Sequence, residues 1–460
     1  MAIYVLNAFH KSICHSNLIR VTSRINLVVL SMMKFPYLTL IFVLIWHQLL
    51  AQKTSRSRLQ KTIAQIEAFQ QAQIGVQLIR LTDGNLLAAW QAERYFTPAS
   101  NTKLLTTLAA VQTFDSLPAL RYTIDSLGIT HFQATGYPLL AHPFYPDMSL
   151  IDFLQKQDSL VYHTSNEKAL NELGPGWSWD DGNYYFSSVP SAFPIYGNVI
   201  QTTKSTTNPN LIHSPDLGVF TENISVKRGV VRMFDNNFSV NPSKIEISDT
   251  LYTPFVPSEL LTLSQIETFL KKKIPHTNSP LDQGKLLNTG NDTILYQAVL
   301  QNSDNLIAEN LLLMVGKQKH GNFSTAETIA QLKKEWQAAP DSWVWVDGSG
   351  LSRYNLVTPR NLIWVLQQLY QKLGPLTIQT YFPQAGVSGT IKRTYGSPKL
   401  PLIFAKTGTL RNNHNLSGFL VDSENNWYAF SIMVNQHTVA TSEVRTGIRE
   451  LLEVLTRRIK

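Results

Sequence analysis

Cysteine is almost absent from this chain of 460 residues, in which the only one is Cys14. A mature form that lacks the first residues would therefore have no thiol, no disulfide and no cysteine metal site. The eleven histidines show no ligand spacing such as His-Glu-x-x-His. We expect neither a metal site nor a cofactor.

Acidic residues are missing from the first 66 positions. Within this stretch Lys34 precedes an apolar run over residues 35–45, and the segment ends near Leu49-Leu50-Ala51. A basic residue, an apolar segment and a small residue before the cut are typical of a secretory signal peptide. We predict a leader over residues 1–51, of which 1–31 look like an extension of the gene model.

The alternative for this leader is a membrane anchor. The stretch 35–51 has 17 residues and includes His47 and Gln48, whereas a membrane-spanning helix needs roughly 20 mostly apolar residues. Cleavage is the favoured interpretation.

Excess charge of one sign is also small. The formal net charge is +8, and four of the positive residues lie within 1–51, which leaves +4 for the rest. No basic run with interleaved aromatic residues is present, so we expect no nucleic-acid partner. With 43% hydrophobic and 16% charged residues, the chain is typical of a globular protein with more than one structural unit.

Three short motifs follow one another along the chain. They are Ser100-Asn101-Thr102-Lys103, then Ser303-Asp304-Asn305, then Lys406-Thr407-Gly408-Thr409. The order Ser-x-x-Lys, Ser-Asp-Asn and Lys-Thr-Gly indicates a serine acyltransferase of the penicillin-recognising type. Because 199 residues separate Lys103 from Ser303, we expect a sizeable insertion in the catalytic domain.

The first motif predicts a nucleophile and its base. Apolar residues at helical spacing follow Ser100, so Ser100 and Lys103 should lie one turn apart on the same face of a helix. A serine hydroxyl needs a group that takes its proton, and a lysine is a useful base only when its pKa falls toward neutrality. We predict Ser100 as the nucleophile and Lys103 as its base, with Lys406 as the second cation that lowers the pKa of Lys103.

The other two motifs predict contacts with the substrate. Ser303 is expected to relay a proton to the leaving amine, and Asn305 to hold a substrate amide. Gly408 in a strand would let a substrate backbone approach closely. The hydroxyls of Thr407 and Thr409 would meet a terminal carboxylate, and the N–H groups of Ser100 and Thr409 would form an oxyanion hole.

The pattern of the remaining chain predicts an α+β fold with an antiparallel sheet flanked by helices. Residues 52–114 and 258–460 are assigned to the catalytic domain, and residues 115–257, with short alternating stretches broken by turn residues, to a mostly β insertion. Segments expected in the catalytic domain are a helix over 58–71, a hairpin over 74–90, helices over 259–272, 293–300, 305–315, 325–338 and 358–373, strands over 402–409, 416–421 and 427–435, and a helix over 441–457.

With these motifs the sequence resembles the class C low-molecular-mass penicillin-binding proteins, the D-alanyl-D-alanine carboxypeptidase/endopeptidase family. The resemblance rests on residues 98–104, 303–310 and 405–410, with further similar segments at 175–181, 347–352 and 386–390. It implies a penicillin-binding-protein/β-lactamase-like transpeptidase domain that acts in the periplasm on peptidoglycan stem peptides through an acyl-enzyme at Ser100. It also implies covalent inhibition by β-lactam antibiotics and leaves open a peripheral association with membrane or cell wall, and the oligomeric state.

Two other functions stay open for this sequence. One is a β-lactamase or esterase with the same acylation chemistry and faster deacylation, although no Glu-x-x-Leu-Asn element follows Ser303. The other is a non-catalytic cell-wall binding protein, which would be expected to have lost Ser100, Lys103 or Lys406. None of the three is lost.

Several residues near the motifs have both a structural and a functional interpretation. The aromatic residues of 177–186 are expected in a core or domain seam rather than in a sugar site. The segment 347–350 fits a turn or a cleft wall equally well. For Glu309 and Arg353 ordinary ion pairing is the expected role.

Overall fold

The computed structural model describes residues 57–165, 173–205, 211–281, 283–457 and 459. The leader predicted over residues 1–51 lies outside the described residues. The described residues from Leu59 onward form one compact unit. In the described part of the chain, no helix has both the length and the apolar character needed to cross a bilayer.

A five-stranded antiparallel sheet forms the centre of the catalytic domain, with the order β14-β15-β16-β1-β2. Its strands are β14 (Leu402–Leu410), β15 (Asn413–Val421), β16 (Trp427–Asn435), β1 (Gln73–Arg80) and β2 (Leu86–Trp90). Because β1 pairs with β16 along its whole length, the N-terminal hairpin and the C-terminal strands close into one sheet. The strand carrying Lys406 is therefore left at an edge.

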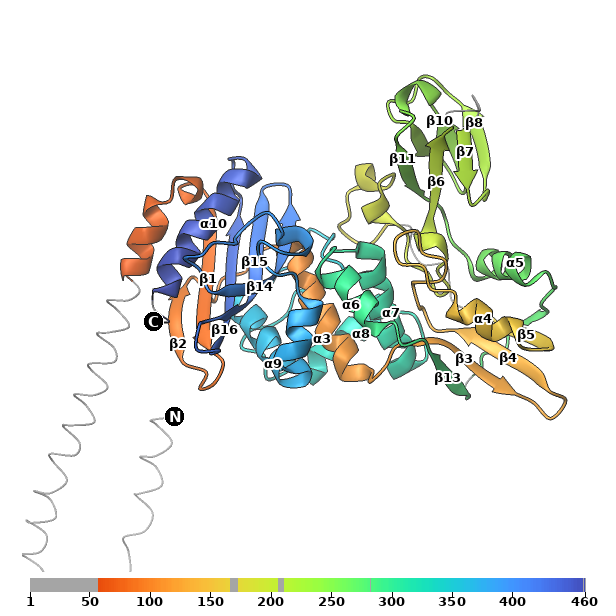
Figure 1. Cartoon of the computed structure of the whole chain (residues 1–460), viewed down its shortest axis with the longest axis horizontal. Coiled ribbons are helices and arrows are strands. Elements are labelled where there is room, and N and C mark those ends of the chain that lie inside the picture. The colour runs from red at the N-terminus through yellow and green to blue at the C-terminus, as the bar shows by residue number, and fades with distance from the viewer. Residues whose placement is uncertain (1–56, 166–172, 206–210, 282, 458, 460) are drawn as a thin grey trace, which may run out of the picture. The chain divides into compact units, whose positions relative to one another are not determined.

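Helices cover both faces of this sheet (Figure 1). The helical residues 59–65 and α10 (Thr441–Thr456) share an apolar core with one face, and α3 (Lys103–Thr113) and α9 (Pro359–Tyr381) pack on the other. Strand alternation explains this division, since Ile403 and Ala405 point to the α10 side while Phe404 points to the α9 side. The predicted α+β fold is confirmed.

Three further helices continue the layer around α3. They are α6 (Asp292–Leu300), α7 (Asn305–His320) and α8 (Thr325–Glu335). Buried residues of α6 and α7 join the same apolar core as α3 and α9. The second motif begins α7, so the packing of α7 on α3 brings that motif beside the first.

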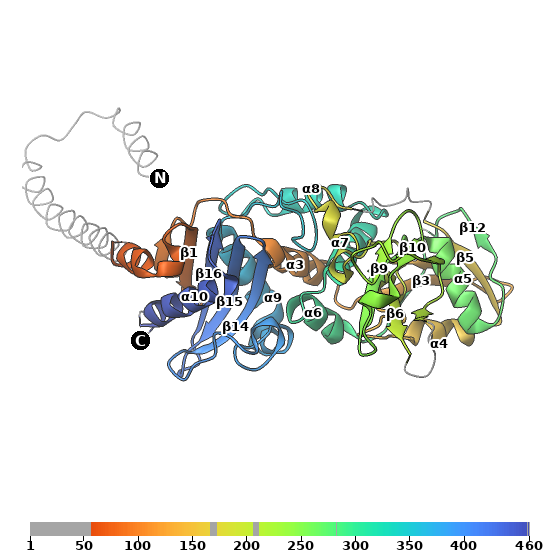
Figure 2. The same ribbon diagram turned by 90° about the horizontal axis from the view of Figure 1, so that it is seen from above.

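The described part of the insertion contains three sheets and two helices, α4 and α5 (Figure 2). The largest has the order β12-β5-β4-β3-β13, and the others have the orders β11-β6-β7 and β8-β10-β9. A shared apolar core joins these sheets to two helices. The elements are β3 (Pro118–Ile124), β4 (Ile129–Ala134), α4 (Ser149–Gln155), β5 (Ser159–His163), β6 (Val199–Lys204), β7 (Leu211–Ser214), β8 (Val219–Glu222), β9 (Val230–Arg232), β10 (Asn237–Val240), β11 (Thr250–Pro254), α5 (Glu259–Leu270), β12 (His276–Thr277) and β13 (Lys285–Asn288).

The C-terminal boundary of the insertion differs from the one expected at residue 258. Helix α5 packs on α4 and contributes Leu263 and Ile266 to the core of the insertion. Strand β13 pairs with β3 in the largest inserted sheet. The chain therefore returns to the catalytic core only at α6. The expected boundary was placed before α5 because a helical period predicts a helix without indicating the sheet on which that helix packs.

Candidate functional site

Ser100 lies in a tight turn between the sheet and helix α3. The 3-10 helix η2 (Ala99–Thr102) carries it and leads directly into α3 at Lys103. The turn is packed so closely on the edge strand that a Cβ on Gly408 would lie 2.2 Å from the carbonyl oxygen of Pro98. Gly408 thus makes room for the turn that bears Ser100.

Lys103 is fully buried behind Ser100. Its Nζ donates hydrogen bonds to Ser100 Oγ at 3.1 Å, to Asn305 Oδ1 at 2.6 Å and to the carbonyl oxygen of Ser349 at 2.7 Å. When this amine is neutral, the amide and carbonyl oxygens can take its two N–H groups. Its lone pair is then directed toward the hydroxyl of Ser100.

Burial lowers the pKa of Lys103 to about 8, although the carboxylates of Glu309, Asp347 and Asp304 act in the opposite direction. A base with a pKa in this range is partly deprotonated at neutral pH and still accepts a proton readily. The electrostatics of the site therefore suit a lysine that takes the proton of Ser100.

The second motif is held by the start of helix α7 and by the insertion. Asp304 caps α7, since its carboxylate accepts a hydrogen bond from Ile307 N at 3.0 Å. Its other oxygen accepts a hydrogen bond from the hydroxyl of Tyr185. The amide nitrogen of Asn305 donates to the carbonyl oxygen of Phe186 at 2.7 Å, which turns Oδ1 of Asn305 toward Lys103.

Lys406 reaches the second motif from the edge strand. Its Nζ donates to Ser303 Oγ at 2.9 Å and to the carbonyl oxygen of Thr407 at 2.8 Å. Burial, and then the charge of Lys103, lower the pKa of Lys406 well below its ordinary value. Loss of water is the largest cause at both amines, and the charge of Lys406, which was expected to lower the pKa of Lys103, is not among the causes of the shift at Lys103.

The loop over residues 347–350 forms a wall of the site. Glu309 is buried and accepts hydrogen bonds from Gly348 N at 2.9 Å and Ser349 N at 2.7 Å. Asp347 accepts from Gly350 N at 2.9 Å. These bonds hold the carbonyl oxygen of Ser349 against Lys103. Glu309 therefore serves this loop, and the ion pair expected for it is replaced by hydrogen bonds to the backbone.

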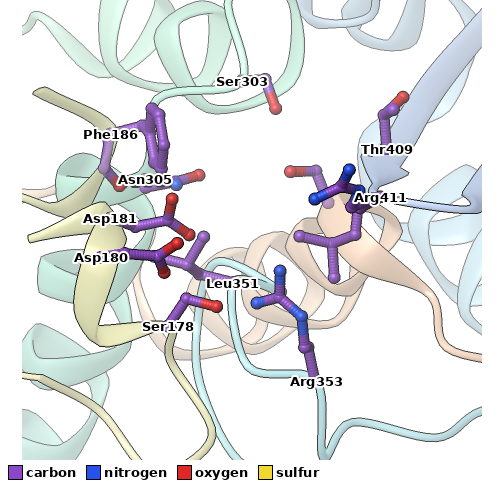
Figure 3. Close-up of a pocket in the computed structure, with 13 residues that line it drawn as sticks. Ser178, Asp180, Asp181, Phe186, Ser303, Asn305, Leu351, Arg353, Thr409 and Arg411 are labelled. Atoms are coloured by element: carbon purple, nitrogen blue, oxygen red, sulfur yellow. Dashed lines mark hydrogen bonds between the residues drawn. The ribbon is translucent and has the colours of Figure 1, made fainter. Parts of the chain in front are cut away.

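The first and second motifs and Thr409 open into one cavity of about 450 Å³ (Figure 3). Lys103 and Lys406 lie behind its wall without solvent exposure. The lining residues are Ser100, Ser178, Asp180, Asp181, Phe186, Ser303, Asn305, Gly350, Leu351, Arg353, Thr409, Leu410 and Arg411. The motif residues that line the cavity are Ser100, Ser303, Asn305 and Thr409. The two lysines of the motifs are buried behind these residues.

The cavity also carries charged residues that lie outside the three motifs. Asp180 and Asp181 extend from the insertion, and Arg353 and Arg411 lie across from them in Figure 3. Arg411 lies two residues beyond Thr409 in the sequence, and the two acids lie within the aromatic segment 177–186. Nothing in the spacing indicated that the two acids and the two arginines would line one cavity with Ser100.

The aromatic segment of the insertion has mixed roles. Trp177 Nε1 donates to Asp347 at 2.9 Å and so supports the wall of the site. Tyr184 and Phe186 stack with ring centroids 5.2 Å apart. Trp179 is 84% exposed, in contrast to the core or seam position expected for this group.

Comparisons with known proteins point to one family. The family described as "D-Ala-D-Ala carboxypeptidase 3 (S13) family" matches residues 55–125 and 292–457. The chain is 25% identical to D-alanyl-D-alanine carboxypeptidase DacB of Haemophilus influenzae over an alignment of 422 residues, which covers 81% of this chain and 87% of the relative. It is 29% identical to penicillin-sensitive carboxypeptidase A of Dictyostelium discoideum over 170 residues, 34% of this chain and 33% of that protein.

A solved structure shows the same fold. The crystal structure of penicillin-binding protein 4 (DacB) of Haemophilus influenzae superposes with a TM-score of 0.66 at 23% identity, covering 88% of this chain and 98% of that one. A second structure of that protein, in complex with a novel β-lactam, gives a TM-score of 0.62 at 21% identity with the same coverage. The likeness extends through the insertion as well as the catalytic domain.

Proposed function

The chain belongs to the D-Ala-D-Ala carboxypeptidase 3 (S13) family, and from this premise we propose that it is a serine D-Ala-D-Ala carboxypeptidase working through an acyl-enzyme at Ser100. The observation that carries the proposal is the contact of 3.1 Å between Lys103 Nζ and Ser100 Oγ, with a pKa of about 8 at that lysine. A serine hydroxyl whose proton can pass to a neighbouring amine can attack a substrate carbonyl and form an ester with it.

In the acylation step, the neutral amine of Lys103 accepts the proton of Ser100 Oγ while that oxygen attacks the carbonyl carbon of the D-Ala-D-Ala peptide bond. The negative charge on the carbonyl oxygen is met by the backbone N–H groups of Ser100 and Thr409. The tetrahedral intermediate then expels the amine of the terminal D-alanine. The rest of the peptide stays bound to Ser100 as an ester, which water hydrolyses.

The leaving amine needs a proton, and the second motif is suited to supply it. Ser303 Oγ can donate its own hydrogen to this nitrogen while it accepts one from the ammonium of Lys406, 2.9 Å away. In deacylation, neutral Lys406 can take a proton from the water that attacks the ester carbonyl, and Lys103 returns its proton to Ser100 Oγ as the ester bond breaks, so both lysines regain their starting protonation. Ser303 and Asn305 therefore act at the leaving-group side, with Asn305 also able to bind a substrate amide.

The third motif is suited to the carboxylate end of the substrate. Thr409 lines the cavity, and Thr407 Oγ1 donates to Thr390 Oγ1 at 2.9 Å within the same edge region. The hydroxyl of Thr409 and the nearby Lys406 can bind a terminal carboxylate, whereas the hydrogen of Thr407 is already donated to Thr390. A cross-linked peptide that presents a free carboxylate next to the scissile bond can bind in the same way, which supports DD-endopeptidase action as a second activity of the site.

The proposed substrates are peptidoglycan stem peptides, and the proposed location is the periplasm. The family supports the first, and the leader expected over residues 1–51 supports the second. β-Lactam antibiotics carry a carboxylate and a reactive amide carbonyl, so they fit the same site as covalent inhibitors. In support, one of the solved structures similar to this chain holds a β-lactam.

The test is the mass of the protein after incubation with penicillin, together with D-alanine release from a peptide ending in D-Ala-D-Ala. We expect one adduct on Ser100, loss of that adduct in Ser100→Ala, and release of D-alanine by the wild type. Labelling that survives Ser100→Ala contradicts the mechanism. Rapid turnover of nitrocefin without D-alanine release would identify a β-lactamase instead, and peptidoglycan binding without either reaction a non-catalytic protein.

A further inference from the structure

A buried histidine stands directly behind the last residue of the third motif. Strands β14 and β15 pair so that Thr409 and His414 are opposite each other, which places their side chains on the same side of the sheet. The distance between Thr409 Oγ1 and His414 Nδ1 is 2.7 Å. The other ring nitrogen, Nε2, is 2.9 Å from the hydroxyl of Tyr395.

The ring of His414 is neutral at physiological pH. The residue has no solvent exposure, and burial lowers its pKa to about 3, with further lowering by the charges of Arg445 and His437. Tyr395 is also buried, and burial raises its pKa. The histidine thus carries one hydrogen on its two nitrogens, and the tyrosine keeps its own.

The position of that single hydrogen follows from the hydrogen-bond partners. Within the described part of the chain, the hydroxyl of Tyr395 has a hydrogen bond with His414 and with no other group. A buried hydroxyl that left its hydrogen unpaired would be unfavourable, so Tyr395 donates to Nε2. The hydrogen of the ring is then on Nδ1, and it is donated to Thr409 Oγ1.

This arrangement determines whether the hydroxyl of Thr409 acts as a hydrogen-bond donor or as an acceptor in the cavity. Its oxygen is already occupied by the N–H of His414, so its own hydrogen is free to turn toward the solvent-accessible side. With the opposite tautomer, Thr409 would donate to Nδ1 and would present only lone pairs to the cavity. Lone pairs repel a carboxylate, whereas a hydroxyl hydrogen binds it.

We propose that His414, oriented by Tyr395, is a positioning residue that holds Thr409 as a hydrogen-bond donor for the carboxylate at the end of the substrate. The inference rests on the proposed function for the identity of the substrate. It goes beyond the three motifs, because neither His414 nor Tyr395 belongs to them. It also predicts that His414 contributes to substrate binding without lining the cavity.

The tautomer itself can be measured without any substrate. In protein labelled with ¹⁵N-histidine, two-dimensional spectra distinguish protonated from unprotonated ring nitrogens, and the signals absent from His414→Gln belong to this residue. We expect hydrogen on Nδ1 of His414 across pH 6–8. Hydrogen on Nε2 overturns the proposal, whether or not the enzyme cleaves D-Ala-D-Ala.

Kinetics then tests the consequence for the substrate. His414→Leu should lower kcat/KM about tenfold to a hundredfold for a peptide with a free carboxylate, mainly through KM, since a hydrogen bond to a charged group is lost. The same substitution should have little effect on a matched peptide in which an amide replaces the terminal carboxylate. His414→Gln, which keeps a hydrogen-bond donor, should recover part of the activity lost in His414→Leu.

A double-mutant cycle provides the control for a merely structural role. If His414 acts through the hydroxyl of Thr409, then His414→Leu should add almost nothing in a Thr409→Val background. An equal loss in both backgrounds, or an equal loss with the amidated peptide, contradicts the proposal. Failure of the wild type to release D-alanine would instead contradict the proposed function, while the tautomer measurement would stand.

Discussion

Raising the pH from 7 to 9 should speed the acylation of Ser100 by about tenfold. Only the neutral amine of Lys103 can take the proton of the hydroxyl, and burial places the pKa of this lysine at about 8. At that pKa about one tenth of the molecules have a neutral Lys103 at pH 7 and about nine tenths at pH 9. The direction is upward with pH because the group acts as a base.

The assay is the second-order rate of labelling by a fluorescent penicillin, measured between pH 6 and pH 10 on the intact protein. A plot of log rate against pH should rise with a slope of one and level off near pH 8. Because an unperturbed lysine titrates near 10.4, the midpoint of the curve reports how far burial has shifted this amine.

Two variants serve as controls for this measurement. Lys103→Arg keeps a cation that does not deprotonate in this range, so labelling should be nearly abolished at every pH. Lys372→Arg changes a lysine whose side chain is 47% exposed, and its profile should match the wild type. A flat profile between pH 6 and pH 9, or a midpoint above pH 10, would refute Lys103 as the base.

Three further substitutions test the packing and the polar contacts of the site. Gly408→Ala would place a methyl group 2.2 Å from the carbonyl oxygen of Pro98, so penicillin labelling should be lost; unchanged labelling would mean that the turn can move away. Asn305→Ala removes the amide that accepts from Lys103 at 2.6 Å and should slow acylation at least about tenfold, with an equal rate counting against the contact. Thr358→Ala removes the cap of α9 and should lower the unfolding free energy by about 1 kcal/mol in a denaturant titration, while labelling stays constant; slower labelling would reveal a link between α9 and the site.

The catalytic core was predictable because its signals are local. The three motifs place Ser100, Lys103 and Lys406 on a helix and a strand, and hydrophobic periodicity gives the surrounding elements, such as the strand over 427–435. Each of these signals lies within one turn or one strand. The roles assigned to these residues stay predictions until the labelling experiments are done.

The missed features depend on contacts between distant parts of the chain. Helix α5 was assigned to the catalytic domain because its period does not identify its packing partner. Glu309 supports a loop about 40 residues away, and Asp181 reaches the cavity from the insertion. His414 could have been noticed, since it lies five residues beyond Thr409, but only strand register shows that the two are opposite each other.

The pairing of β3 with β13 means that the insertion leaves and rejoins the catalytic domain through neighbouring strands. Two adjacent chain ends require no rearrangement of α3 or α6, whatever lies between them. The segment between β3 and β13 can thus be lengthened, shortened or exchanged during evolution while the catalytic residues keep their positions. The contacts of Tyr185 and Phe186 with the second motif are what such an exchange would have to replace.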